Sequence, residues 1–243
     1  MTFRLVVLSA GLSQPSSTRL LADRLAAAAS ARLRGAGQEV DVTTLELRPL
    51  AHDITDAMLS GFPSGALTEA LEAVAQADAL IAVTPVFAGT FSGLFKSFID
   101  VVPRGDLAGT PVLIGATGGS SRHSLAVDHA LRPLFSYHQA VTVPTGVFAA
   151  TSDFGAMGSV RGAGLTDGAV EADGLSMRIE RAAQELVRLS APAAPAPSGL
   201  DGDAVWSATA PGAPTAPSIA RTREEDTNTQ FTPFSELLAA RRG

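Results

Sequence analysis

The sequence of 243 residues contains no cysteine, one tryptophan, one tyrosine and a single lysine among 18 basic side chains. The absence of cysteine excludes disulfide bridges, iron–sulfur clusters, cysteine-ligated zinc and thiol catalysis. The four histidines are scattered along the chain and form no recognisable ligand motif. We therefore expect no metal site.

Charge is also scarce, at 17% of residues, and the 24 acidic side chains outnumber the 18 basic ones, for a formal net charge of −6. Nucleic-acid binding usually needs a basic face, so this class of function is not expected. No apolar run approaches the roughly 18 residues of a membrane span. The first apolar run breaks at Ser9, too early for a signal peptide. We expect a cytoplasmic protein that binds neither nucleic acid nor a membrane.

Short apolar runs alternate with segments of helical periodicity over the first 190 residues. The runs lack polar alternation, as strands covered on both faces do, and lie at Phe3–Leu8, Val40–Leu45, Ala79–Val83, Pro111–Ala116 and Val141–Val147. Helical spacing predicts helices at Thr18–Leu33, Leu67–Ala77, Phe91–Val101, Ser124–Tyr137 and Leu175–Leu189. This order predicts an α/β fold, a doubly wound five-stranded parallel sheet with helices on both faces.

The domain organisation follows from changes in composition. Residues 1–190 are predicted to form one domain, in which Thr151–Gly174, rich in Gly, Asp and Ser, is expected to be a long mobile loop. Residues 191–220 have the Pro/Ala-rich composition of a disordered linker. Residues 221–243 form a C-terminal extension with an apolar segment, FTPFSELLAA, which is expected to be a short helix that docks on the domain or on a partner subunit.

The loop after the first predicted strand combines small and hydroxyl residues with an immediate helix start. Gly11 permits a close turn, and three hydroxyl residues, Ser16, Ser17 and Thr18, stand in a row. Free amides at a helix start carry partial positive charge and bind phosphate. Neither GxxxxGK[ST] nor GxGxxG is present, so a P-loop and a standard dinucleotide site are not expected. The alternative interpretation is an ordinary helix cap.

The third and fourth predicted strands also end in small residues. Thr84-Pro85-Val86-Phe87 offers free amides and an aromatic wall for a flat heteroaromatic ligand, and Thr117-Gly118-Gly119-Ser120 offers close backbone approach. The alternative is an ordinary strand-to-helix loop in each case. Arg122 and His123 follow and either face a second anionic ligand or are solvated. Carboxyl strand ends meet at one edge of such a sheet, so the three loops together predict one cleft for a phosphate-bearing planar molecule.

Three segments together resemble the NAD(P)H-dependent FMN reductases, most closely the alkanesulfonate and methanesulfonate branch. They are SAGLSQPSSTRLLADRL, VTPVFAGTFSGLFKSFID and ATGGSSRHSLAVDHALRPL. The resemblance implies a flavodoxin-like fold with strand order 2-1-3-4-5 and a homodimer or homotetramer. It also implies an enzyme that supplies reduced FMN to a separate flavin-dependent monooxygenase.

The resemblance assigns the FMN site residue by residue. The phosphate would be held by Ser9, Ser16, Ser17 and Thr18, and the isoalloxazine ring would be lined by Pro85, Val86, Phe87 and Ala88 on one side and by Thr117, Gly118 and Gly119 on the other. Phe87 stands where the family often has tyrosine. His129 lies where the sulfonate branch carries an aromatic or histidine residue in an interface helix, often with a π-bulge.

The implied reaction transfers a hydride from NADPH or NADH to flavin N5, chemistry that belongs to the cofactor. No catalytic side chain is therefore expected, and Arg104, Arg122 and Arg161 are equal candidates to contact a nicotinamide 2′-phosphate. Three other functions stay open. They are an FMN-bound quinone, azo or chromate reductase, a non-catalytic electron carrier, and an interaction protein that uses its C-terminal peptide.

Overall fold

The structure is a computed structural model that describes residues 2–155 and 167–191. Its sheet has the strand order β2-β1-β3-β5, and both β6 and β7 pair with the outer edge of β5. All pairings are parallel except that of β4 with β3. The strands are β1 (Phe3–Ser9), β2 (Val40–Glu46), β3 (Ala79–Phe87), β4 (Thr90–Phe91), β5 (Pro111–Gly118), β6 (Val141–Thr142) and β7 (Val147–Ala150).

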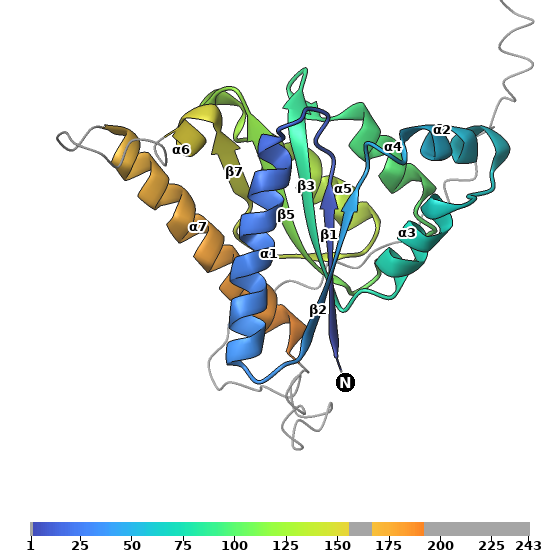
Figure 1. The fold of residues 1–243 in the computed structure, drawn as a ribbon, viewed down its shortest axis with the longest axis horizontal. Helices are drawn as coiled ribbons and strands as arrows, with labels where there is room; N and C mark the ends of the chain where they lie inside the picture. The colour runs from blue at the N-terminus through green and yellow to red at the C-terminus, as the bar shows by residue number, and fades with distance from the viewer. Residues whose placement is uncertain (1, 156–166, 192–243) are drawn as a thin grey trace, which may run out of the picture. The chain divides into compact units, whose positions relative to one another are not determined.

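Helices cover both faces of this sheet (Figure 1). Helices α1 and α7 pack side by side on one face, and α2 to α5 lie on the other. The helices are α1 (Ser17–Gly35), α2 (Ala51–Ser60), α3 (Ala66–Ala75), α4 (Gly93–Val101), the 3-10 turn η1 (Ser121–His123), the π-helix η2 (Val127–Leu131), α5 (Arg132–Tyr137), α6 (Thr151–Gly155) and α7 (Asp167–Ser190). The predicted α/β class and the flavodoxin-like order 2-1-3-4-5 are confirmed.

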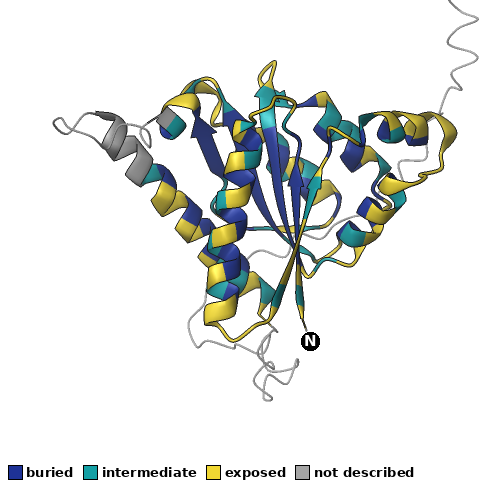
Figure 2. Ribbon diagram, in the orientation of Figure 1, coloured by how far each residue is buried: buried dark blue, intermediate teal, exposed yellow. Residues whose placement is uncertain are grey.

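The side chains of β1 explain why its sequence shows no polar alternation. Leu5 and Val7 point into the core beneath α1 and α7, whereas Val6 and Leu8 point into the core beneath the other helices. Alternate side chains of a strand face opposite sides, and here both sides are covered. The central strands are accordingly buried along most of their length, while exposed residues lie on the edge strand β2, in the loops and on the outer faces of the helices (Figure 2).

The fifth predicted strand, Val141–Val147, is divided into β6 and β7 in the structure. Residues Pro111 and Val112 of β5 pair with β6, and Gly115 to Gly118 pair with β7. Pro144 lies between the two pieces and has no amide hydrogen to donate to the ladder. The apolar pattern therefore predicted a strand at the correct edge of the sheet but did not predict its division into β6 and β7.

Three predicted segments need further correction. The helix expected at Phe91–Val101 begins at Gly93, because Ser92 caps it and Phe91 belongs to β4. The helix expected at Ser124–Tyr137 is instead η2 followed by α5, and helix α2 was not predicted. The region expected to be a long loop, Thr151–Gly174, contains α6 and the first residues of α7.

Several expectations fall on residues that the structure does not describe. Residues 156–166 of the predicted loop, the linker from residue 192 onward and the C-terminal extension all lie outside the described ranges. Within residues 2–155 and 167–191, no helix is long and apolar enough to cross a membrane.

Candidate functional site

The start of α1 lies directly beyond the carboxyl end of β1. Ser16 is the N-cap residue, and its Oγ accepts a hydrogen bond from the Arg19 amide at 3.2 Å. Gly11 lies so close to this cap that an added Cβ would sit 2.0 Å from Ser16 Oγ. The loop is therefore folded tightly onto the helix start, and a side chain at position 11 would displace the Ser16 hydroxyl from its capping position.

The electrostatics of this helix start favour an anion. The first intrahelical hydrogen bond is donated by Leu20 to the Ser16 carbonyl, so the amides of Ser17 and Thr18 have no acceptor within the helix. The first turn of this 19-residue helix contains no acidic side chain that would repel a phosphate. Amides at such a position carry partial positive charge. The residues present fit a phosphate monoester.

The Arg19 side chain forms ion pairs. Its guanidinium pairs with Asp23 at 2.8 Å and also with Glu46 of β2. The hydrogen bond to Asp23 raises the pKa of Arg19 above its ordinary value. The charge of this side chain is thus engaged in ion pairs on the helix surface, and the donors that the loop offers to an anion are neutral.

A buried hydroxyl pair ties this loop to the end of β5. Thr18 Oγ1 and Thr117 Oγ1 lie 2.8 Å apart, and both residues are almost fully buried. Ser9, at the end of β1, is also buried, at 2% exposure. Thr18, predicted to bind the flavin phosphate, and Thr117, predicted to line the flavin ring, therefore lie together at one edge of the sheet.

The end of β3 is a hairpin and not the ordinary strand-to-helix loop of the alternative interpretation. Val86 and Phe87 pair with Phe91 and Thr90 in an antiparallel hairpin. Ala88 and Gly89, at its tip, both have positive φ, 49° and 85°, as a type I′ turn requires. The hairpin projects the apolar side chain of Phe87, which is 49% exposed, beyond the sheet edge.

Thr84 anchors this hairpin to α4. Its buried Oγ1 accepts a hydrogen bond from the Ser92 amide at 3.0 Å, and Ser92 Oγ in turn caps α4 by accepting from the Phe95 amide at 3.2 Å. The same β3 end is in register with β5, with Pro85 opposite Thr117. The hairpin is thus held beside the third predicted loop.

At the end of β5, Gly118 packs against a residue that the sequence analysis did not single out. An added Cβ at Gly118 would lie 2.9 Å from Cζ of Phe148 on β7, whereas Gly119 has open space around its Cα. Phe148 belongs to the predicted fifth strand, and its apolar run was the only sequence signal for it. The Phe148 ring fills the space beside Gly118, and the open space beside Gly119 leaves this part of the edge accessible to a flat ligand.

The three arginine candidates for a 2′-phosphate are placed differently. Arg122 lies in η1, just beyond β5 on the side of the predicted cleft, next to the exposed His123. Arg104 precedes β5 and contacts the ring of Tyr137 at 5.2 Å, so it lies toward the opposite end of that strand. Arg161 lies outside the described residues.

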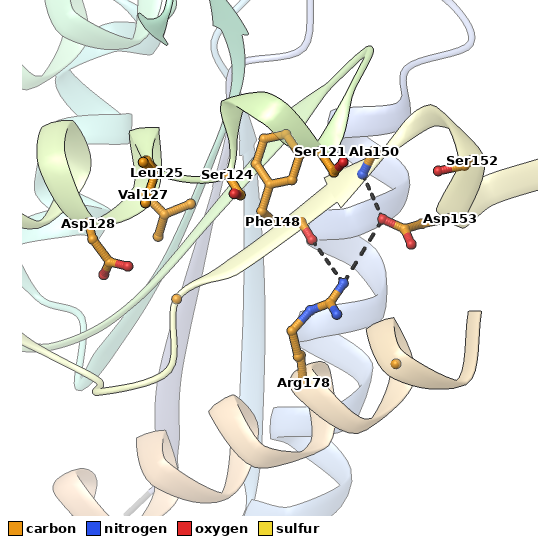
Figure 3. Close-up of a pocket in the computed structure, with 12 residues that line it drawn as sticks. Ser121, Ser124, Leu125, Val127, Asp128, Phe148, Ala150, Ser152, Asp153 and Arg178 are labelled. Atoms are coloured by element: carbon orange, nitrogen blue, oxygen red, sulfur yellow. Dashed lines mark hydrogen bonds and ion pairs between the residues drawn. The ribbon is translucent and has the colours of Figure 1, made fainter. Parts of the chain in front are cut away.

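Beside the predicted flavin loops lies a cavity of about 470 Å³ (Figure 3). Phe148 and Arg178 line it together with Ser124 and Leu125. Arg178, from α7, donates to the Phe148 carbonyl at 3.3 Å. Arg178 was not predicted, because nothing in the periodicity of α7 distinguishes it from the helix's other arginines.

The π-helix that the resemblance implied is present. It spans Val127–Leu131, includes His129, and leaves the His129 side chain on the surface. Its neighbours Val127 and Leu131 are buried, so the π-turn is anchored in the core and presents His129 outward.

Comparison with known proteins identifies the family. Residues 3–155 match the family described as NADPH-dependent FMN reductase. The chain is 37% identical over 184 residues, 76% of this chain and 90% of the relative, to an NADH-dependent FMN reductase, SfnE, of Pseudomonas putida. It is 37% identical over 152 residues, 63% and 79%, to an FMN reductase (NADPH) of Pseudomonas aeruginosa.

A solved structure gives the same result. The crystal structure of an oxidoreductase from Corynebacterium diphtheriae is similar with a TM-score of 0.69 and 44% identity, over 77% of this chain and 96% of that one. The predicted family and the predicted enzyme class are confirmed. With a matching fold and with the three loops gathered at one sheet edge, the chain belongs to the NADPH-dependent FMN reductase family, and it is an NAD(P)H-dependent oxidoreductase that acts on FMN.

Proposed function

We propose that the chain reduces FMN as a released substrate and supplies the reduced flavin to a partner monooxygenase. The observation that carries this proposal is the chemistry of the phosphate loop. Every side chain from Ser9 to Thr18 is neutral, and the nearby Arg19 is held by Asp23 and Glu46. Charge-assisted bonds to phosphate are about twice as strong as neutral ones, so a site of neutral donors suits a ligand that must leave.

The phosphate would be bound by the helix start. In this proposal the amides of Ser17 and Thr18 donate to the phosphate, the Ser16 and Ser17 hydroxyls add donors, and the buried Ser9 shapes the floor of the loop. Gly11 supports this role because its missing side chain lets the loop close over the helix cap.

The flavin ring would lie between the hairpin and the glycine loop. Pro85, Val86, Phe87 and Ala88 flank one side, and Thr117, Gly118 and Gly119 flank the other. When bound, the flavin supplies the hydride-acceptor chemistry. The chain's own task is to orient the ring against the nicotinamide and to shield it, and no side chain acts as acid, base or nucleophile.

The nicotinamide preference is part of the proposal. One relative is named NADH-dependent and another is named for NADPH. We propose that both nucleotides react and that the chain acts as a homodimer or homotetramer, with the π-helix around His129 in the interface.

The test is the oxidation of NADPH, and separately of NADH, followed at 340 nm with and without added FMN. Turnover that rises with FMN concentration and saturates supports the proposal and ranks the two nucleotides. Tightly retained yellow colour with no dependence on added FMN would contradict it. A ping-pong pattern with a quinone would then support an FMN-bound quinone reductase, and absence of turnover would support an electron carrier.

A further inference from the structure

The cavity beside the glycine loop combines groups that are typical of a nucleotide site. Phe148, Leu125 and Val127 form an apolar wall, and Arg178 supplies a cation. The cavity volume of about 470 Å³ lies within the usual range of small-molecule pockets. The hydroxyl-bearing residues of its lining are Ser121, Ser124 and Ser152.

Arg178 keeps enough freedom to bind a ligand. Its side chain is 44% exposed, and Asp153, its ion-pair partner among the described side chains, lies at 4.0 Å. The Asp153 carboxylate is nearly buried and accepts a 2.7 Å hydrogen bond from the Ala150 amide. Figure 3 shows the guanidinium reaching up from α7 between the Phe148 carbonyl and Asp153. An anion that enters from solvent therefore meets the exposed guanidinium before the buried carboxylate.

The second acid of the lining is also compensated. Asp128 Oδ1 accepts hydrogen bonds from Arg132 at 2.9 and 3.1 Å. Neither carboxylate is thus left as an uncompensated negative charge. Arg178 is more exposed than Asp153, its ion-pair partner. The cavity therefore suits a ligand with a negatively charged group and an apolar or planar part.

The cavity shares a wall with the proposed flavin site. The ring of Phe148 touches Gly118, where an added Cβ would lie only 2.9 Å from Cζ, and Ser121 continues the same loop into the cavity. A molecule with one part over the flavin ring would therefore find its next binding surface here. The dinucleotide substrate of the reductase has that extended shape.

We propose that this cavity binds the adenosine phosphate half of the nicotinamide dinucleotide, with Arg178 donating to one of its phosphates. This inference rests on the proposed function, because it concerns the second substrate of that reaction. Arg178 is a binding residue in this scheme and takes no part in hydride transfer. The phosphate is either the 2′-phosphate of NADPH or the diphosphate bridge common to both nucleotides.

The first experiment compares wild type, Arg178→Gln and Arg181→Gln in steady-state kinetics with NADPH and with NADH. Arg181 is an exposed arginine on the same helix that does not line the cavity, so it is the matched control. Loss of one charge-assisted hydrogen bond should raise KM for the nucleotide about tenfold in Arg178→Gln. A rise for NADPH alone assigns the 2′-phosphate, and a rise for both assigns the diphosphate bridge. Nucleotide KM values within about twofold of wild type would overturn the proposal.

A second pair of variants guards against misfolding of Arg178→Gln, which also loses its bond to Phe148. Ser124 is exposed at the cavity rim, so Ser124→Asp adds a negative charge there, and Ser124→Asn is the neutral control. Ser124→Asp should raise the nucleotide KM, while Ser124→Asn should not. A shift in the KM for FMN of equal size would place the effect in the flavin site and count against the proposal.

A binding measurement separates this inference from the proposed function. Adenosine 2′,5′-bisphosphate contains no nicotinamide and needs no flavin reduction, so its binding is followed by calorimetry. Binding that weakens about tenfold in Arg178→Gln and is unchanged in Arg181→Gln supports the cavity even if FMN reduction fails. Equal binding by all variants would overturn it even in a working reductase.

Discussion

Thr18 at the start of α1 and Thr117 at the end of β5 are 99 residues apart in the sequence, yet their hydroxyl oxygens lie 2.8 Å apart in a buried hydrogen bond. The bond joins the loop proposed to hold the flavin phosphate to the strand end proposed to contact the flavin ring. Because both hydroxyls are shielded from water, each depends on the other for its hydrogen bond. This polar contact adds to the apolar packing of α1 on the sheet in holding the helix start beside the glycine loop.

Replacement of either threonine by valine should destabilise the fold. Thr18→Val leaves the Thr117 hydroxyl buried without its partner, at a cost of about 1–3 kcal/mol in the free energy of unfolding. The double variant Thr18→Val/Thr117→Val should lose less than the sum of the single variants, because it leaves no orphaned hydroxyl. Urea denaturation measures the cycle, and additive losses would show that the pair is not coupled.

Ser17→Asp should separate flavin binding from stability. An acidic side chain in the first turn of a helix interacts favourably with the helix dipole, so the melting temperature should stay the same or rise. The same charge should repel the FMN phosphate and weaken FMN binding by about tenfold or more. Quenching of FMN fluorescence measures the affinity, with the neutral variant Ser17→Asn as control. Unchanged affinity in Ser17→Asp would remove Ser17 from the phosphate site.

His138 should contribute to loss of stability in acid. The residue is 7% exposed, its Nδ1 has no hydrogen-bond partner within residues 2–155 and 167–191, and burial lowers its pKa from the ordinary value of 6.5. Asp100 opposes this shift of the pKa, whereas Lys96 and Arg104 reinforce it. Below pH 6.5 the unfolded chain takes up a proton at this histidine that the folded chain resists, so the free energy of unfolding falls as the pH falls.

The variant His138→Gln isolates this effect, since glutamine does not titrate. Between about pH 7.5 and about pH 5.5 its free energy of unfolding should fall less than that of the wild type. Chemical denaturation at the two pH values gives the comparison. An equal loss in both proteins would assign the acid sensitivity to other groups.

We expect a chain that ends after residue 193 to fold and bind flavin. The two buried apolar clusters of the described structure draw their members from Leu5 to Leu186, and Met1–Ala193 form one compact unit. The shortened chain should keep the wild-type midpoint in urea and the wild-type affinity for FMN. Insoluble protein, or an early midpoint, would show that the C-terminal residues are needed for the fold.

Much of the candidate site could be predicted from the sequence, because it depends on local chemistry. A row of hydroxyl residues ahead of a helix predicts an anion site wherever the fold places it, and Ser16 to Thr18 do form the cap and first turn of α1. The glycine pair after β5 likewise lies at a strand end. Phe148 and Arg178 could not be predicted as candidate site residues. Phe148 is placed there by its contact with Gly118, and Arg178 by its hydrogen bond to Phe148, and both contacts join residues distant in the sequence.

The sequence by itself determined the order of the main strands and of most of the helices, since apolar runs and helical periodicity are local properties of the chain. It also determined the family, through three segments whose residue types suit phosphate and ring binding. Only the tertiary structure decided that Pro144 divides the last strand, that the Pro85–Ala88 segment belongs to a hairpin, and that Thr18 meets Thr117. These features depend on contacts between residues distant in the sequence, and local periodicity does not predict which side chains such contacts bring together.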